Sequence, residues 1–303
     1  CKFPQVLGHQ IVGKIIEKGK DVNGFILGEI VCLEGIQWCG KCASCKKGDF
    51  NHCLNRRQIG LDIEYSGGYA EFISVEAKYC YSLKSLHQNY SNISDIIDLG
   101  ALIEPIAGVY EGMFSYGGFL PGQNVAVFGA GMSGIAAIQL ARASGAAKII
   151  AVEPNKFRRN MAKLMGAYYI IDPFDQPDFV GEMILDYTNG QGIAMGIDAS
   201  GSPSLSIQQM EKGLEVGGRI VIISMVAEYP RIDIMSYVRN KNFIFGTYGH
   251  AGHNNFVHVV NLIATKRMNL LPFITGRIGL NDIGAELANE TREKQGAIIY
   301  KKI

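Results

Sequence analysis

The sequence predicts an α/β protein in which a doubly wound parallel sheet is combined with a second, mostly β domain. Two observations lead to this prediction. From Asn124 onward, short apolar runs alternate with helical stretches of about 10–15 residues, which is the pattern of a parallel sheet covered by helices. Up to about Lys84, short strand-like runs are instead separated by glycines, which is typical of an irregular antiparallel β domain.

Length and composition set the class of protein. A chain of 303 residues is long enough for two domains, and 48% apolar with 19% charged residues is typical of a soluble globular enzyme. A formal net charge of +1 gives no attraction to nucleic acid or to an anionic membrane, and no apolar run approaches the roughly 18 residues of a membrane-spanning helix. We therefore expect neither partner. The chain starts without an initiator Met or a targeting pattern, so we expect an N-terminal part to be missing.

The first predicted domain covers residues 1–105. Its strand-like runs are QIVGKIIEKG at 10–19, GEIVCLE at 28–34 and GGYAEFISV at 67–75. Each run contains β-branched or aromatic residues and lies next to glycine, which predicts short strands joined by turns.

The second predicted domain covers residues 106–246 and has the alternating pattern. A buried strand, NVAVFGAG, leads into a helix rich in small residues, MSGIAAIQLARASG. A second strand, helix and third strand follow, and later strands are predicted near 196–200, 217–224 and 242–249. Residues 247–303 contain a helical stretch at 254–268, another near 281–290 and a final strand at 296–303, which we expect to return to the first domain.

A glycine-rich turn between the first strand and helix predicts a dinucleotide site. Residues 129–134, GAGMSG, fit the G-x-G-x-x-G pattern in the strand–turn–helix context that the pattern requires. Gly129 would make the tight turn, Gly131 would let the backbone approach the pyrophosphate, and Gly134 would let helix and strand pack closely. The helix N-terminus would supply N–H groups for the phosphates.

An acidic residue at the end of the next strand predicts the choice of cofactor. The carboxylate of Glu153 can accept hydrogen bonds from ribose hydroxyls, whereas a 2′-phosphate beside it would be repelled by roughly 4 kcal/mol per charge pair at 4 Å. NAD is therefore expected rather than NADP. Arg158 either holds a ribose or phosphate oxygen or lies on a solvated helix face. Ser224 and Thr247, at the ends of late strands, should border the nicotinamide, because ligands bind beyond the carboxyl ends of parallel strands.

A cluster of cysteines predicts a metal site. Cys39, Cys42, Cys45 and Cys53 account for four of the seven cysteines and lie in one short stretch, CGKCASCKKGDFNHC. Four thiolates suit a closed, structural Zn²⁺ site, although their spacing is also compatible with an iron–sulfur cluster. Such a cluster in a large α/β enzyme indicates a reducing compartment, so we expect the cytoplasm.

In sequence order, these features resemble the zinc-containing medium-chain dehydrogenase/reductases, which include alcohol, sorbitol and threonine dehydrogenases. VLGHQIVGKI resembles the family's Gly-His-Glu segment, SGGYAEF its Gly-x-x-Ala-Glu turn, and LIEPIAGVYEG its Glu-Pro segment. The cysteine lobe (residues 39–53) and the nucleotide fingerprint lie in their usual order. The resemblance implies a GroES-like catalytic domain, a Rossmann NAD-binding domain and a homodimer or homotetramer.

The resemblance also implies a second, catalytic zinc with His9 and Glu104 as ligands. Two departures from the family's pattern bear on it. Gln10 stands where the family usually has Glu, which would make the zinc a stronger Lewis acid or weaken its binding. The family's catalytic cysteine lies in a segment ahead of this chain, so Cys1 is either an ordinary loop cysteine or a ligand.

These features together predict a zinc-dependent dehydrogenase that transfers hydride between NAD and a secondary alcohol, such as a polyol, cyclitol or amino alcohol. Its partner would be a small alcohol or ketone, with Tyr248, His250 and His253 as candidate polar groups on the substrate side. Two alternatives remain open. One is a reductase of the zinc-free type that uses NAD(P)H, and the other is a non-catalytic NAD-binding protein with only a structural zinc.

Overall fold

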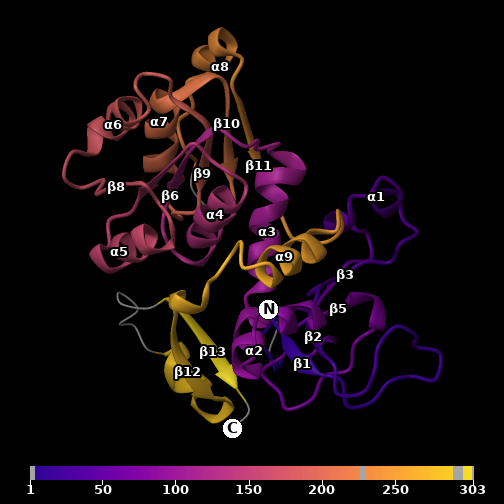
Figure 1. Ribbon diagram of the computed structural model, residues 1–303. Helices are drawn as coiled ribbons and strands as arrows, with labels where there is room; N and C mark the ends of the chain where they lie inside the picture. The colour runs from indigo at the N-terminus through magenta and orange to yellow at the C-terminus, as the bar shows by residue number, and fades with distance from the viewer. Residues whose placement is uncertain (1–3, 226–228, 289–295, 302–303) are drawn as a thin grey trace. The chain divides into compact units, whose positions relative to one another are not determined.

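The structure is a computed structural model that describes every residue except 1–3, 226–228, 289–295 and 302–303 (Figure 1). The chain forms two compact units. Unit 1 comprises Cys1–Gly108 and Gly249–Ile303, and unit 2 comprises Val109–Tyr248. Cys1, considered above as a metal ligand, lies outside the described residues. Within them, no helix is long and apolar enough to cross a membrane.

Unit 2 is built on a six-stranded parallel sheet with the strand order β11-β10-β9-β6-β7-β8. The strands are β6 (Asn124–Phe128), β7 (Lys148–Val152), β8 (Tyr169–Ile171), β9 (Ile193–Asp198), β10 (Leu214–Ile222) and β11 (Phe243–Gly246). The chain starts in the middle at β6, adds β7 and β8 on one side, and then returns to add β9 to β11 on the other. This doubly wound order is the Rossmann topology, so the predicted α/β fold is confirmed.

The sheet is buried because helices accompany it. They are α4 (Met132–Ala143), α5 (Lys156–Met165), α6 (Val180–Tyr187), α7 (Pro203–Gly213) and α8 (Ile234–Asn240). Every residue of β6 is buried, as expected for a central parallel strand that is covered on both faces. Apolar side chains of the sheet, such as Phe128 and Ile150, share a core with Ile184 of α6 and Met210 of α7.

Unit 1 is richer in short strands. Its extended elements are β1 (Val12–Lys14), β2 (Ile30–Leu33), β3 (Ile36–Gln37), β4 (Arg57–Gln58), β5 (Cys80–Ser82), β12 (Ile274–Gly279) and β13 (Ala297–Lys301). β1, β2 and β5 form an antiparallel sheet, β3 pairs antiparallel with β4, and β12 pairs parallel with β13. Its helices are α1 (Ala43–Lys46), α2 (Ile93–Ala101), α9 (Asn255–Ala264) and α10 (Ile283–Leu287), together with most of α3 (Ile103–Tyr110), whose last two residues belong to unit 2.

One predicted strand of this unit is wrong. Residues 67–75 form no regular strand, because the two glycines at their start lie against the loop that precedes His9. Gly67 N–H donates to the Val6 carbonyl at 2.8 Å, and Gly68 N–H donates to the Gly8 carbonyl at 2.8 Å. A Cβ on Gly67 would lie 2.3 Å from the Leu7 oxygen, so this close approach requires glycine. The segment thereby supports the backbone at His9.

Candidate functional site

The four clustered cysteines form a compact site. Their sulfur atoms all lie within 4.8 Å of one another, with Cys42 Sγ 3.5 Å from Cys45 Sγ and 3.8 Å from Cys53 Sγ. A tetrahedral zinc with Zn–S bonds of about 2.3 Å places its sulfurs about 3.8 Å apart, which matches this spacing. An iron–sulfur cluster would have to fit several irons and sulfides between the same cysteines and would hold them further apart. The geometry therefore favours a structural zinc.

Hydrogen-bond donors lower the pKa values of these thiols, and burial raises them. The N–H of Lys41 and the side-chain amide of Asn55 donate to Cys39, which lowers the pKa of its thiol to about 6. Cys45 is buried, and desolvation raises the pKa of its thiol to about 12. A cation is therefore needed to hold all four groups as thiolates at neutral pH, as metal binding does.

A second cluster in unit 1 contains His9, Glu104 and His250. Glu104 lies in the first turn of α3, and His250 lies in the loop before α9. Nε2 of His250 is 2.8 Å from Oε1 of Glu104, and the two residues are only 3% and 7% exposed. Burial by itself raises the pKa of the Glu104 carboxyl, but the charges of His250 and His9 outweigh it and the net pKa is lowered. Glu104 is therefore held as a carboxylate.

A glycine leaves room between the two histidines of this cluster. A Cβ placed on Gly35 would lie 3.7 Å from the Cβ of His9 and 3.8 Å from Nε2 of His250, so both side chains border the same space. The imidazole of His9 and the carboxylate of Glu104 are donors that catalytic zinc sites use, whereas Nε2 of His250 faces Glu104. In chemical type the residues present fit the metal that the family resemblance implies, although the ligand atoms that converge on one position among the described residues are those of the four cysteines. His250, which the sequence suggested only as a substrate-side group, lies beside Glu104.

The structure also gives a physical role to Gln10. Its side chain makes a hydrogen bond to Glu104, which contributes to the lowered pKa of that carboxyl. A glutamate at this position would instead place a second negative charge beside Glu104. The neutral amide therefore removes a repulsion that the family's usual residue would create here.

In unit 2, the three fingerprint glycines occupy three different environments. Gly129 has φ +90°, and a Cβ on it would lie 2.5 Å from the Ala199 oxygen. A Cβ on Gly131 would meet nothing within 4 Å, whereas one on Gly134 would lie 1.9 Å from the Gly129 oxygen. These environments correspond to a tight turn, an open backbone and close packing of α4 on the turn, which is the geometry that the pattern requires, and contact with a cofactor stays a prediction.

Glu153 follows β7 and touches the same loop. Its Oε2 accepts a hydrogen bond from Ala130 N–H at 2.7 Å and its Oε1 accepts one from Asn155 N–H at 2.8 Å, with the residue 3% exposed. The carboxylate thus fastens the fingerprint loop, a role that the sequence did not suggest, and it keeps further lone pairs for a ligand.

Two neighbouring arginines on α5 differ in their partners. Nη2 of Arg159 lies 2.7 Å from Oδ2 of Asp172, so this side chain is engaged within the protein. Nε of Arg158 is buried and makes no hydrogen bond to any residue that the structure describes. Arg158 is therefore the better placed of the two to contact a cofactor oxygen.

The remaining predicted cofactor residues lie at the carboxyl edge of the sheet. Ser224 follows β10, and its hydroxyl donates to Asp198, which also accepts hydrogen bonds from Ser200 Oγ at 2.6 Å and Ser206 Oγ at 2.8 Å. Thr247 follows β11; its hydroxyl is buried and has no hydrogen-bond partner among the described side chains and backbone. Ser224 thus has a structural partner, and Thr247 is the residue with an unused donor.

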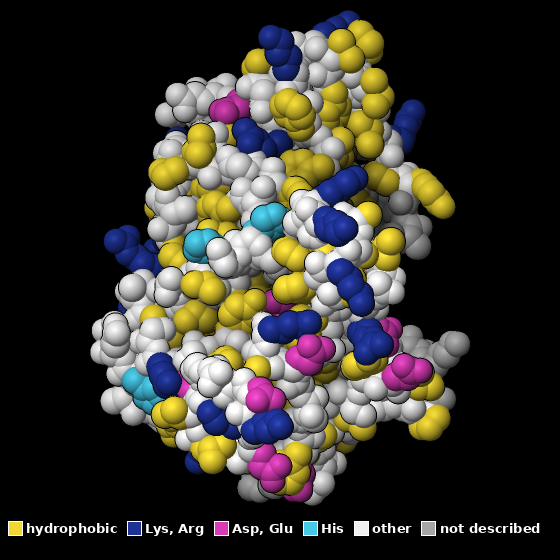
Figure 2. Space-filling view, turned by 90° about the vertical axis from the view of Figure 1, so that its right-hand side faces the viewer, with side chains coloured by type: hydrophobic (Ala, Val, Ile, Leu, Met, Phe, Trp, Pro, Cys, Tyr) yellow, Lys and Arg dark blue, Asp and Glu magenta, His cyan; other side chains and the backbone are white. Residues whose placement is uncertain are grey.

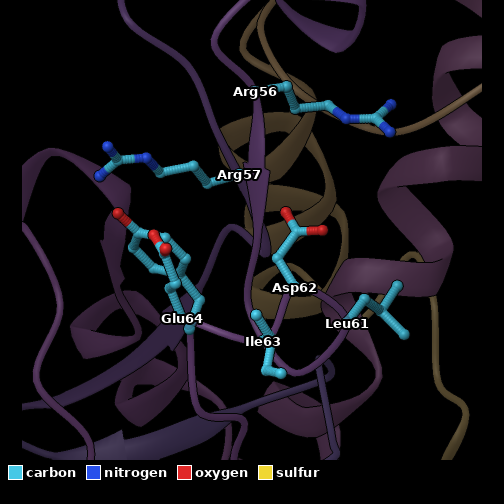
Figure 3. Close-up of a pocket in the computed structure, with 7 residues that line it drawn as sticks. Arg56, Arg57, Leu61, Asp62, Ile63 and Glu64 are labelled. Atoms are coloured by element: carbon cyan, nitrogen blue, oxygen red, sulfur yellow. The ribbon is translucent and has the colours of Figure 1, made fainter. Parts of the chain in front are cut away.

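A surface hollow in unit 1 lacks the features of a ligand site. It has a volume of about 490 Å³ and is lined by Arg56, Arg57, Leu61, Asp62, Ile63, Glu64 and Tyr65. Figure 3 shows the side chains of Arg56 and Arg57 pointing in opposite directions, so they do not converge on one anion. We assign no function to this hollow.

Comparisons with known proteins agree with a GroES-like unit 1 and a Rossmann unit 2. The alcohol dehydrogenase GroES-like domain matches residues 1–85, and the zinc-binding dehydrogenase family matches residues 134–265. Scyllo-inosose 3-dehydrogenase of Thermotoga maritima is 34% identical over 93% of this chain and 72% of its own length. L-Threonine 3-dehydrogenase of Pyrococcus furiosus is 32% identical over 90% of this chain and 74% of its own.

Solved structures give the same result. The structure of a presumed alcohol dehydrogenase from Thermotoga maritima superposes with a TM-score of 0.92 at 32% identity, covering 98% of this chain and 77% of the other. The chain therefore belongs to the zinc-binding medium-chain dehydrogenases, a family of NAD(P)-linked enzymes that act on alcohols.

Proposed function

We propose that the protein oxidises a secondary alcohol with NAD and that a second zinc is held by His9 and Glu104, with His250 beside them. The observation that carries this proposal is the buried Glu104–His250 pair, 2.8 Å apart, with His9 close enough to lower the pKa of Glu104. The names of two relatives support a cyclitol, polyol or amino alcohol as substrate, since one relative is a scyllo-inosose dehydrogenase and another a threonine dehydrogenase.

The residues of the second site would have different roles in binding the metal and orienting its ligands. A zinc bound there would supply Lewis acidity toward the substrate oxygen. Glu104 provides a carboxylate that is already ionised, and Nε2 of His250 lies 2.8 Å from its Oε1. Gln10 fixes the same carboxylate by a hydrogen bond without adding charge. These contacts orient the acceptor atoms before substrate arrives, which is the function of groups that surround a metal ligand.

The cofactor would bind at the carboxyl edge of the unit 2 sheet. Gly131 leaves the backbone open to the pyrophosphate, and the N-terminus of α4 supplies N–H groups to it. Glu153 would accept the ribose hydroxyls and repel a 2′-phosphate, which favours NAD over NADP. Arg158 and Thr247, which have donors without a partner among the described residues, are proposed to contact the cofactor, with Ser224 nearby.

We also propose that the protein is a homodimer or a homotetramer in the cytoplasm. β11 is an edge strand, and Phe243 on it is 60% exposed. On α8, Ile234 and Val238 are 65% and 67% exposed, and apolar side chains gather at the upper end of Figure 2, where α8 lies. Pairing of two β11 strands would cover this edge. Sedimentation of the purified protein tests it, and a monomer at micromolar concentration would contradict it.

Zinc content and turnover of a His9→Ala variant test the main proposal. We expect two zinc ions per chain in the parent and one in the variant, with turnover of secondary alcohols lowered by more than about 100-fold because a ligand is lost. His87→Ala, which changes an exposed histidine elsewhere in unit 1, is the matched control and should keep both ions. One zinc in every form, with tight NAD binding and no turnover, would instead support a non-catalytic NAD-binding protein.

A further inference from the structure

A buried asparagine of the cysteine lobe holds the loop that carries His250. Asn51 lies in a single 3₁₀ turn, Phe50–His52, directly before Cys53. Its Oδ1 accepts hydrogen bonds from the backbone N–H of His250 at 2.9 Å and of Ala251 at 2.7 Å, and its Nδ2 faces the Ala251 oxygen at 3.5 Å. Asn51 is 1% exposed. Two segments that are far apart in the sequence are therefore joined by one side chain.

Glycines on the other side of this contact show how close it is. A Cβ on Gly249 would lie 2.3 Å from Oδ1 of Asn51, and one on Gly252 would lie 2.4 Å from Cδ2 of Phe50. Phe50 in turn packs on Trp38, with ring centroids 4.4 Å apart. The loop thus lies directly against two adjacent residues of the lobe.

The loop itself has an unusual backbone. Gly249, Gly252, His253 and Asn254 all have positive φ, at +83°, +87°, 50° and 56°. Two of these residues are not glycine, and left-handed conformations of such residues persist only where the surroundings enforce them. Asn51 and Phe50 contact the same loop just ahead of these two residues, at His250, Ala251 and Gly252.

The His250 side chain contacts residues outside the loop. Its Nε2 is 2.8 Å from Oε1 of Glu104, and its ring packs edge-on against Phe256 at 5.4 Å. Backbone and side chain of His250 are therefore held by two different partners, the lobe and the second site. A displacement of the backbone by a fraction of an ångström would alter the contact with Glu104.

We propose that Asn51 is a positioning residue: it sets His250 against Glu104, and so links the fold of the cysteine lobe to the geometry of the second metal site. The link follows from its position, because Asn51 lies between Cys45 and Cys53 and the N–H of Cys53 bonds to the carbonyl of Phe50 at 3.1 Å. The importance of the link for catalysis rests on the function proposed above, whereas the positioning of His250 does not.

The test compares Asn51→Ala, Asn51→Asp and His52→Ala. Asn51→Ala removes both acceptor contacts, and Asn51→Asp keeps an acceptor for both N–H groups. His52→Ala is the matched control: it changes the next residue, an exposed histidine whose ring pairs with Asp49 at 2.8 Å. The imidazole NMR signals of the protein report on His250 directly, with His250→Gln to assign its signal. Zinc content, NAD affinity, KM and kcat are measured alongside.

We expect Asn51→Ala to shift the His250 signal and to lower kcat at least tenfold, while zinc at the cysteines and NAD affinity stay as in the parent. Asn51→Asp should restore most of the parental His250 signal position and most of kcat. His52→Ala should change neither the His250 signal nor kcat. An unshifted His250 signal with parental kcat in a merely less stable Asn51→Ala protein would overturn the proposal. If the parent itself turned over no alcohol, the proposed function would fail, and the His250 signal would still decide whether Asn51 positions it.

Discussion

Two glycine-containing loops, residues 129–134 in unit 2 and 249–254 in unit 1, are held in contrasting ways. The first is closed by near neighbours: Gly134 packs on the oxygen of Gly129, and Glu153 from the adjacent strand accepts the N–H of Ala130. The second is held by Asn51 and leads to Glu104, both far away in the sequence. A loop of the first kind has a local sequence pattern, whereas a loop of the second kind depends on the tertiary fold.

Alanine at two fingerprint glycines should have the largest effect and should separate fold from cofactor binding. In Gly134→Ala the new Cβ would lie 1.9 Å from a backbone oxygen that cannot move aside. We therefore expect the free energy of unfolding to fall by about 3 kcal/mol, and we expect NAD binding to be lost as well. In Gly131→Ala the Cβ meets nothing within 4 Å, so stability should change by less than about 0.5 kcal/mol.

NAD affinity should nevertheless fall in Gly131→Ala by about tenfold or more, because the Cβ occupies the approach to the pyrophosphate. Denaturant unfolding and NAD titration measure the two effects. Equal stability losses in both variants would show that the loop is not divided into a packing side and a ligand side.

The contrast between the loops also explains what could be predicted from the sequence. The parallel sheet, the fingerprint glycines and the cysteine lobe were predictable, because apolar runs, strand–turn–helix order and ligand spacing are local properties. The strand predicted at 67–75 is wrong because Gly67 and Gly68 serve a contact with residues 6–8 that no local pattern reveals.

The second site shows the same limit. The family resemblance pointed to His9 and Glu104, but no spacing rule pairs Glu104 with His250 or His250 with Asn51. The double role of Glu153 was hidden for a similar reason, since its contact with Ala130 arises from the parallel pairing of β6 and β7. The signal that could have marked the 249–254 loop is its two glycines flanking His250, which permit a close approach of another segment.

Alanine at Gly252 should have an intermediate effect, and it probes the second loop from the lobe side. Its Cβ would lie 2.4 Å from Phe50, and φ is +87°, so we expect a loss of about 2 kcal/mol in the free energy of unfolding. Gly24→Ala is a matched control, with φ +86° and nothing within 4 Å of the new Cβ, and should lose only about 1 kcal/mol.

Turnover should distinguish these two variants further. Gly252→Ala should lower kcat with unchanged NAD affinity, and Gly24→Ala should leave both as in the parent. If the two variants lost the same stability and the same activity, the contact between the loop and the cysteine lobe would be incidental.

The smallest effect is expected at Glu153, where the two roles of one carboxylate can be separated. Glu153→Gln keeps one acceptor oxygen but turns an NH₂ group toward a backbone N–H, because Oε1 and Oε2 both accept such bonds now. This mismatch should cost about 1 kcal/mol of stability.

The loss of negative charge should also raise kcat/KM with NADP relative to kcat/KM with NAD by about tenfold. This change is smaller than the full Coulomb repulsion would give, because water and salt screen the charges. Arg158→Gln, a neutralisation on the other side of the same site, should shift the ratio in the opposite direction. A ratio that Glu153→Gln leaves unchanged would mean that this carboxylate fastens the fingerprint loop and takes no part in choosing the cofactor.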